Sequence, residues 1–173
     1  KRPLSSGKLT LKTANFIFLI ITGLGLTLSF SLDPLFGVLM IGLIINTEVY
    51  SRITKNIIFL DVFAIGINFV IRAISGIFLI NTPVSPWIVL GVFFVALFLG
   101  FMKRKSEMLT LKNMAHNHRK VLKKYTLKIL NISVFISGMV TLCIFIIHSI
   151  IGPLNDGRLI LTIPFIVIII LRQ

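Results

Sequence analysis

Long apolar runs recur along the chain and constrain its fold more than any other feature. Six segments are apolar enough to cross a hydrocarbon core of roughly 30 Å, and short polar or proline-containing breaks separate them. The predicted spans cover Ala14–Leu32, Pro34–Thr47, Ile57–Ile80, Pro86–Met102, Thr126–Ile151 and Arg158–Leu171. The second and sixth are short and would need tilting or a thinner bilayer. The sequence therefore predicts an all-α, polytopic transmembrane helix bundle.

The composition and the charge pattern agree with a membrane protein. Of the 173 residues, 56% are hydrophobic and 13% are charged, and the mean hydropathy is +1.02, which excludes an ordinary soluble domain. A net charge of +13 would suggest nucleic acid in a soluble protein, but here the cations gather in alternate loops, most densely from Lys103 to Lys128. This asymmetry predicts that the basic loops face the cytoplasm. We therefore expect a multi-pass protein of the cytoplasmic membrane without a nucleic-acid partner.

Several short motifs argue against other functions. Cys143 is the only cysteine, so the chain has neither an intrachain disulfide nor a cysteine cluster for a structural metal. His116 and His118 stand two residues apart and would point to different faces of a helix, whereas helical zinc sites use a four-residue spacing. The Ser5–Lys8 stretch lacks the upstream glycine of a phosphate loop. Neither zinc nor nucleotide binding is predicted from these residues.

A polar stripe runs along the third predicted span. At helical spacing, four residues fall within roughly 60° of one another: Asp61, Asn68, Arg72 and Ser75. Asp61 lies about one turn inside the cytoplasmic end, and Arg72 lies about 16 Å deeper. Polar groups inside a membrane must face protein, ligand or water. Asp61 is therefore a candidate metal- or phosphate-site residue, whereas Arg72 either lines a cavity or bonds to backbone carbonyls of neighbouring helices.

Two cytoplasmic segments offer groups for an anion site. After the second span, Tyr50 and Lys55 can point into one cavity, although any cytoplasmic loop is expected to be basic. After the fourth span, Lys103 and Arg104 offer two cations for a pyrophosphate, and Glu107 offers a carboxylate for Mg²⁺. An ordinary intrahelical salt bridge explains the same spacing equally well, so both interpretations stay open.

Three groups of residues, in one order and at characteristic spacing, carry a family resemblance. They are Arg2–Gly7, the polar and aromatic positions within Tyr50–Trp87, and the Lys103–Glu107 motif. Together they resemble the decaprenyl-phosphate phosphoribosyltransferases, a branch of the UbiA prenyltransferase superfamily. The stretches His118–Thr126 and Pro164–Arg172 also resemble family segments, so the resemblance covers essentially the whole chain.

The resemblance implies a UbiA-like bundle of about nine spans, of which residues 1–173 would supply about six as one transmembrane domain. It implies a piece of a longer protein that lacks the amino-terminal spans, the first aspartate-rich loop and the last span. The start at Lys1 within a polar segment, and the end at Gln173 where the last span emerges, agree with this expectation. Because such metal sites need several carboxylates at once, we expect this piece alone to be inactive.

The same resemblance implies the site residues. Asp61, Glu107 and Tyr50 are expected to be catalytic, and Asp61 and Glu107 are expected to hold Mg²⁺ together with first-loop carboxylates absent from this chain. The expected phosphate-binding residues are all cationic: Arg2, Lys55, Lys103, Arg104 and Arg72.

The implied activity is transfer of 5-phosphoribose from phosphoribosyl pyrophosphate to a polyprenyl, decaprenyl-like phosphate, with release of pyrophosphate, for cell-envelope biosynthesis. The expected partners are these two substrates and the membrane, and a second copy of the chain is a candidate partner. One alternative is a UbiA-type prenyltransferase that moves a prenyl chain from its diphosphate to an aromatic acceptor. Such an enzyme usually has a second aspartate-rich loop, whereas Lys103–Glu107 contains no aspartate. A transporter is a third candidate, but no inverted repeat supports it.

Overall fold

Five long helices make up most of the part of the chain that the computed structural model describes, residues 10–111, 120–151, 163–164 and 167–168. They are α1 (Leu11–Leu32), α2 (Pro34–Arg52), α3 (Leu60–Leu79), α4 (Pro86–Leu111) and α6 (Leu127–Ile151), with short 3-10 turns at η1 (Thr54–Asn56) and η3 (Lys120–Lys123). Each long helix is long and apolar enough to cross a membrane. The prediction of an all-α, polytopic membrane protein is confirmed.

The helix boundaries differ from the predicted spans at the charged ends. α2 continues five residues past Thr47 to Arg52, and α4 continues from Met102 to Leu111. Side-chain ion pairs one helical turn apart support both extensions, because Arg52 binds Glu48 at 3.1 Å and Arg104 binds Glu107 at 3.1 Å. The second span therefore needs no thinner bilayer. The sixth predicted span lies mostly outside the described residues.

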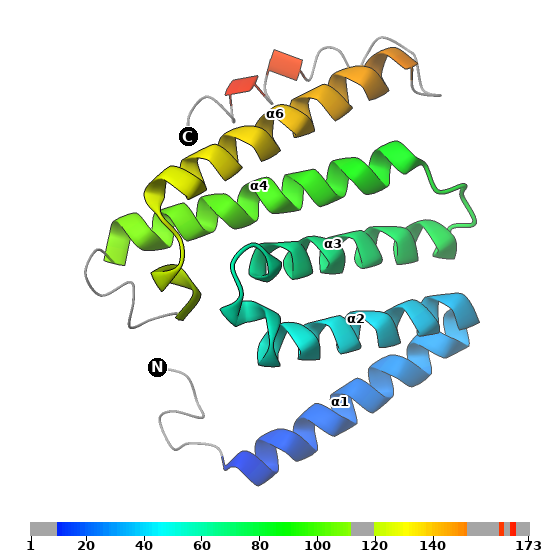
Figure 1. The fold of residues 1–173 in the computed structure, drawn as a ribbon. Helices are drawn as coiled ribbons and strands as arrows, with labels where there is room; N and C mark the ends of the chain where they lie inside the picture. Colours follow the sequence, from blue (N-terminus) through cyan, green and yellow to red (C-terminus); the bar gives the residue numbers. More distant parts are fainter. Residues whose placement is uncertain (1–9, 112–119, 152–162, 165–166, 169–173) are drawn as a thin grey trace.

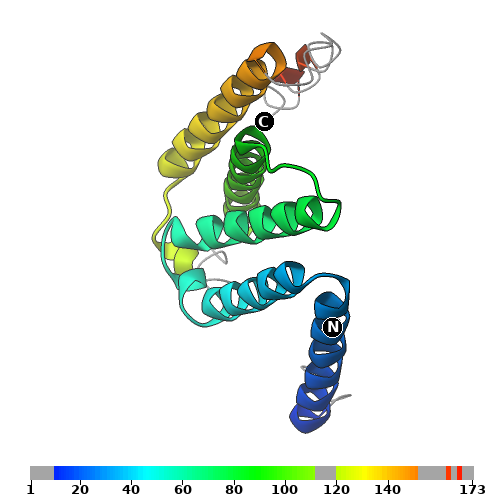
Figure 2. The ribbon, with the colours of Figure 1, turned by 90° about the vertical axis from the view of Figure 1, so that its right-hand side faces the viewer.

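The helices form a single curved layer in which each packs against its neighbour in sequence (Figure 1): α1 on α2, α2 on α3, α3 on α4, and α4 on α6. The view in Figure 2 shows α1 and α6 at opposite edges of this layer. The main buried core joins α3, α4, α6 and the segment before α6, through Val62, Leu97, Phe98, Phe101, Val121, Tyr125, Leu130 and Val134. Most apolar side chains of α1 are exposed and available to lipid or to further helices.

Capping residues make the sharp turn between α1 and α2. The Asp33 carboxylate accepts a hydrogen bond from the Phe36 amide at 2.9 Å, and Pro34 occupies the first position of α2, where no amide hydrogen is needed. At the start of α1, the Thr10 hydroxyl accepts from the Thr13 amide at 3.2 Å. Because Asp33 alone separates the two helices, its cap turns the chain back on itself within one residue and places α1 and α2 antiparallel.

A polar ladder joins α2 to α3 within the membrane. The Asn46 amide donates to the Ala64 carbonyl at 2.9 Å and to the Asn68 side chain at 2.8 Å, and Asn68 donates to the Thr47 hydroxyl at 3.3 Å. Hydrogen bonds of this kind hold membrane helices together where the hydrophobic effect cannot. The ladder fixes the rotation of α3, and with it the side of the helix on which Asp61 lies.

Gly100 allows α3 and α4 to approach closely. A β-carbon at this position would lie 2.5 Å from the Val62 Cγ1 atom, and Val62 is fully buried and branched, so it cannot turn away. We expect Gly100→Ala to destabilise the protein by about 1–3 kcal/mol through overpacking, measured by reversible unfolding in mixed detergent micelles. Gly76→Ala is the matched control, because nothing lies within 4 Å of its β-carbon, and it should be neutral or slightly stabilising. Equal stability of the two variants would contradict the close α3–α4 contact.

Candidate functional site

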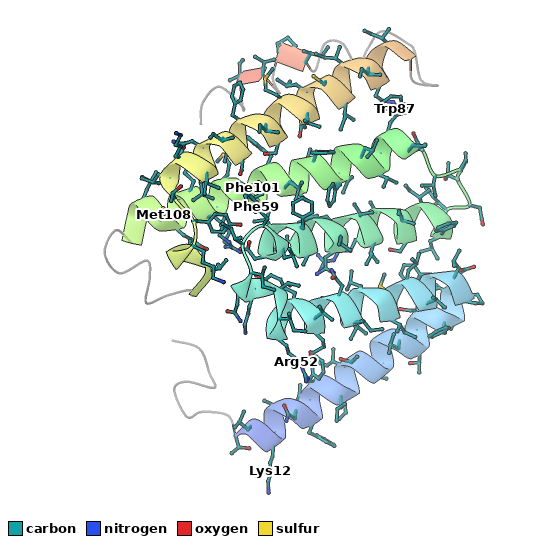
Figure 3. The ribbon with its side chains drawn as sticks, viewed as in Figure 1. Lys12, Arg52, Phe59, Trp87, Phe101 and Met108 are labelled. Carbon is teal, nitrogen blue, oxygen red and sulfur yellow. The ribbon has the colours of Figure 1, made fainter. Side chains whose placement is uncertain are left out.

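Exposed cations gather at one end of the helix layer, which we call the basic end. It is formed by the starts of α1, α3 and α6 and the ends of α2 and α4, on the left in Figure 1. The exposed cations of this end are Lys12, Arg52, Lys55, Lys103, Lys124 and Lys128. Figure 3 shows Lys12 and Arg52 on this side and Trp87 at the opposite end. The basic end is where the predicted site residues of α3 and α4 lie.

A buried cluster of four side chains, the Asp61 cluster, lies at the basic end. Its members are Asp61, Arg104, Glu107 and Tyr125. The Arg104 Nε atom donates to one Asp61 carboxylate oxygen at 2.6 Å, and the Tyr125 hydroxyl donates to the other at 2.8 Å. Asp61 is 0% exposed and Arg104 1%. The Arg104 Nη1 atom donates to Glu107 at 3.1 Å, and the Glu107 side chain remains 25% exposed. The cluster therefore joins a sealed ion pair to one accessible carboxylate.

The local backbone explains why Asp61 points inward. Phe59 precedes α3 with a positive φ of 65°, a conformation that few side chains adopt without compensation. Its amide donates to the Tyr125 hydroxyl at 2.8 Å, and its ring packs edge-on against the Tyr125 ring at 5.9 Å between centroids. The Tyr125 hydroxyl therefore bridges the cap of α3 and the carboxylate in its first turn.

The segment before α6 holds Tyr125 in place. Val121 and Leu122 in η3 are each 0% exposed, and Tyr125 is 4% exposed. Tyr125 stands 64 residues after Asp61 in sequence, and its hydrogen bond to Asp61 attaches the segment before α6 to the start of α3. We call residues 120–125 the strap.

Burial, and secondly the charge of Asp61, raise the pKa of Tyr125 above its ordinary value of about 10. Tyr50→Phe leaves Tyr125 as the only tyrosine in these 173 residues, so phenolate absorbance near 295 nm should appear only well above pH 10. Because the fold favours the neutral phenol, this stabilisation is fully present below pH 10 and is lost as pH rises through the raised pKa. A phenolate that forms at the ordinary pKa would contradict the buried hydrogen bond to Asp61.

The structure brings three of the predicted site residues, Asp61, Arg104 and Glu107, into direct contact. The intrahelical salt bridge that the sequence left open is present between Arg104 and Glu107. Asp61 is fully buried and each of its oxygens accepts a hydrogen bond, so a metal ion could reach this carboxylate only if the packing around it opened. Glu107 is therefore the accessible carboxylate of the cluster.

The other predicted residues surround the cluster or lie apart from it. Tyr50, in the last turn of α2, is near enough to Arg104 to interact with its charge. Lys55 in η1 and Lys103 on α4 are exposed at the basic end. Arg2 lies outside the described residues.

Arg72 is separated from the Asp61 cluster. It lies eleven residues further along α3, about 16 Å by helical rise, and its side chain is exposed. The predicted polar stripe therefore divides into two parts: Asp61 belongs to the cluster, and Asn68 belongs to the ladder with α2. Within the described residues, no hydrogen bond from the Arg72 guanidinium to a backbone carbonyl is found. Its position favours neither direct contact with Asp61 nor contact with a phosphate held at Lys103.

An apolar groove opens beside the cluster. Its volume is about 550 Å³, and it is lined by Phe59, Leu60, Phe63, Phe94, Leu97, Phe101, Ser133, Ile136 and Ser137. Phe59 and Phe101 pack edge-on with ring centroids 6.0 Å apart, and Figure 3 shows both next to the basic end. Phe59 therefore binds the buried polar cluster through the Tyr125 hydroxyl and also lines the groove, so the groove lies directly beside the cluster.

Comparison with protein families gives a match over the complete sequence, because the model of the UbiA prenyltransferase family covers residues 1–173. The chain belongs to the UbiA prenyltransferase family. No curated protein gives a significant match to the chain. Family membership identifies this chain as a multi-pass membrane transferase, and UbiA-family prenyltransferases act on a prenyl lipid.

UbiA-family prenyltransferases generally use Mg²⁺ with diphosphate substrates. Within the described residues, no group of three or more acidic, histidine or cysteine side chains could enclose a metal ion. Mg²⁺ is commonly bound by one or two carboxylates together with water and substrate phosphates, and the accessible Glu107 carboxylate fits that manner of binding. Glu107 is therefore the described residue best suited to hold Mg²⁺ in this UbiA-family chain.

Sequence reasoning missed one member of the site, Tyr125, and one residue that positions α3, Asn46. Tyr125 had no assigned role, because a tyrosine at the edge of a basic loop is typical of any membrane interface. Asn46 was read as part of an apolar span, although an amide inside a membrane helix is itself a signal for a helix–helix contact. Residue spacing within one helix could not reveal either contact, because Tyr125 and Asn46 each bind a residue on another segment of the chain.

Proposed function

We propose that this protein transfers 5-phosphoribose from phosphoribosyl pyrophosphate to a polyprenyl phosphate at the basic end, which faces the cytoplasm. The observation that supports the proposal is that the apolar groove includes Phe59, whose amide binds the Asp61 cluster and which lies next to the exposed cations of the basic end (Figure 3). An acceptor with a phosphate head and an isoprenoid tail requires both surfaces side by side. The positive-inside asymmetry supports the cytoplasmic membrane as the location.

The balance of charge supports a highly anionic donor. The final turns of α4 present the exposed Lys103, whereas the charge of the buried Arg104 is already paired with Asp61 and Glu107. A donor with a pyrophosphate and a further phosphate carries more negative charge than a prenyl diphosphate, so it needs more cations. Lys55, exposed in η1 after α2, adds a positive charge from a second segment of the chain.

The reaction is a displacement at the anomeric carbon of ribose. A phosphate oxygen of the lipid forms the new bond to this carbon, the bond to the pyrophosphate oxygen breaks, and pyrophosphate leaves with the electron pair. Lys103 and Lys55 are assigned to stabilise the negative charge that develops on the leaving group, and Tyr50 to orient the donor. Mg²⁺, when bound, neutralises charge on the pyrophosphate. Apolar walls around the acceptor tail exclude water that would otherwise hydrolyse the donor.

Asp61 is assigned a supporting part in this proposal. It holds the Arg104 guanidinium by the Nε atom, which leaves the Nη1 atom directed to Glu107. Direct binding of Mg²⁺ by Asp61 stays a prediction, because it requires the ion pair to open. Arg72 stays a predicted phosphate ligand, although its depth in the membrane favours a separate role.

The test uses the intact protein in nanodiscs with labelled phosphoribosyl pyrophosphate, decaprenyl phosphate and Mg²⁺. Label should appear in the lipid fraction, and chelation of the metal should abolish the transfer. A parallel reaction supplies a prenyl diphosphate and an aromatic acid. If only the second reaction gives a product, the protein is a prenyltransferase with an aromatic acceptor, and the proposal is wrong.

A further inference from the structure

We propose that Tyr125 is a positioning residue that controls the metal affinity of the site through Asp61, Arg104 and Glu107; this inference rests on the proposed function. The Tyr125 hydroxyl is the junction of the chain of contacts. It accepts a hydrogen bond from the Phe59 amide and donates one to Asp61, both at 2.8 Å. No role in the reaction requires Tyr125 to touch a substrate.

The contacts form a continuous path from the strap to the accessible carboxylate. Tyr125 occupies the first Asp61 oxygen, so the second oxygen is turned to the Arg104 Nε atom at 2.6 Å. The Arg104 guanidinium is planar, so fixing its Nε atom also fixes the direction of its Nη1 atom. That atom holds Glu107 at 3.1 Å. Each group in the path therefore sets the orientation of the next.

The hydroxyl and the ring of Tyr125 have separable functions. The ring is 4% exposed and packs on Phe59, which accounts for the attachment of the strap. The hydroxyl contributes little to this packing, but its hydrogen bond orients Asp61. Without that hydrogen bond the Asp61 carboxylate can rotate. A rotated carboxylate no longer holds Arg104 in the geometry that presents Glu107. Tyr125→Phe keeps the ring and removes only the orienting group.

The experiment measures Mn²⁺ affinity of the intact protein in nanodiscs by electron paramagnetic resonance, with Mn²⁺ as the probe for the Mg²⁺ site. Partners that orient a metal ligand typically change metal affinity by about 10- to 100-fold, and we expect Tyr125→Phe to weaken Mn²⁺ binding by this factor. Glu107→Gln should weaken binding at least as much. The double variant should bind no more weakly than Glu107→Gln, because both changes act on one carboxylate.

Leu130→Ala is the matched structural control. Leu130 is 0% exposed in the same core and its side chain has no polar group, so its truncation lowers stability without removing a hydrogen bond of the polar path. The inference is wrong if Tyr125→Phe lowers stability as Leu130→Ala does but leaves the Mn²⁺ affinity unchanged. Additive losses in the double variant, or no Mn²⁺ binding by the unaltered protein, would overturn it as well.

If Tyr125→Phe does not fold, Asp61→Asn tests the same inference. The hydrogen-bond path from Tyr125 to Glu107 runs through Asp61 and Arg104, so Asp61→Asn must also weaken Mn²⁺ binding, with no further loss when it is combined with Glu107→Gln. Unchanged affinity overturns the inference. Metal affinity is measured without a donor, which separates this inference from the proposed function. If Tyr125→Phe weakens Mn²⁺ binding but no phosphoribosyl transfer is found, only the proposed reaction is rejected. If transfer is found but Tyr125→Phe leaves Mn²⁺ affinity unchanged, only the role of Tyr125 is rejected.

Discussion

Asp61→Ala is expected to destabilise the protein by about 3–5 kcal/mol, because it leaves the buried Arg104 guanidinium without its main counter-ion. Arg104 is 1% exposed, so water cannot replace the lost carboxylate. The remaining contact with Glu107 does not compensate, since it engages a different nitrogen of the guanidinium. Reversible unfolding in mixed detergent micelles measures the loss directly.

A second substitution tests the cause of that loss. Adding Arg104→Met to Asp61→Ala removes the uncompensated charge and keeps much of the side-chain volume, so most of the stability should return. Arg52→Met is the matched control for removal of an arginine, because its ion pair with Glu48 is exposed and should contribute little. If the double variant is as unstable as Asp61→Ala, the cost arises from packing around Asp61 and not from the buried charge.

Lys103→Ala is expected to lower kcat/KM for phosphoribosyl pyrophosphate by roughly 10²–10³-fold, the usual effect of removing one group that stabilises developing negative charge. Lys103 is exposed at the end of α4, so its truncation should leave the thermal stability of the protein nearly unchanged. The measurement is the initial rate of label transfer to lipid at several donor concentrations.

Lys12→Ala provides the control for Lys103→Ala. Lys12 is an exposed lysine at the same end of the molecule, but it lies on α1, which does not contact α4 or the Asp61 cluster. Its removal should leave kcat/KM unchanged. Equal losses in the two variants would mean that the basic end acts through its overall field and that Lys103 does not contact the donor.

The fold was largely predictable from the sequence, and the reason is physical. A helix that crosses lipid must satisfy its backbone internally and present apolar side chains, so each span leaves a long apolar run. Where a helix extends beyond the lipid, this constraint ends. The extension of α2 to Arg52 and of α4 to Leu111 depends on local ion pairs, which hydropathy does not register.

Three of the four residues of the Asp61 cluster could be singled out from the sequence, but Tyr125 and the arrangement of the four could not. A carboxylate inside an apolar run marks Asp61 as exceptional, and the motif that contains Arg104 and Glu107 marks the end of α4. The pairing of Asp61 with Arg104 depends on the rotation and height of two helices relative to each other. Close packing at Gly100 and the ladder at Asn46 set these quantities, and helical periodicity within one span contains no information about them.

The separation of the cluster along the chain has a consequence for biogenesis. Asp61 is synthesised 43 residues before Arg104 and 64 residues before Tyr125. At a translation rate of about 5–20 residues per second, the carboxylate waits roughly 2–9 s for its counter-ion. A lone carboxylate in the first turn of α3 opposes stable insertion during that interval. We therefore expect the α3–α4 hairpin to enter the lipid as one unit, and the strap to close over Asp61 afterwards.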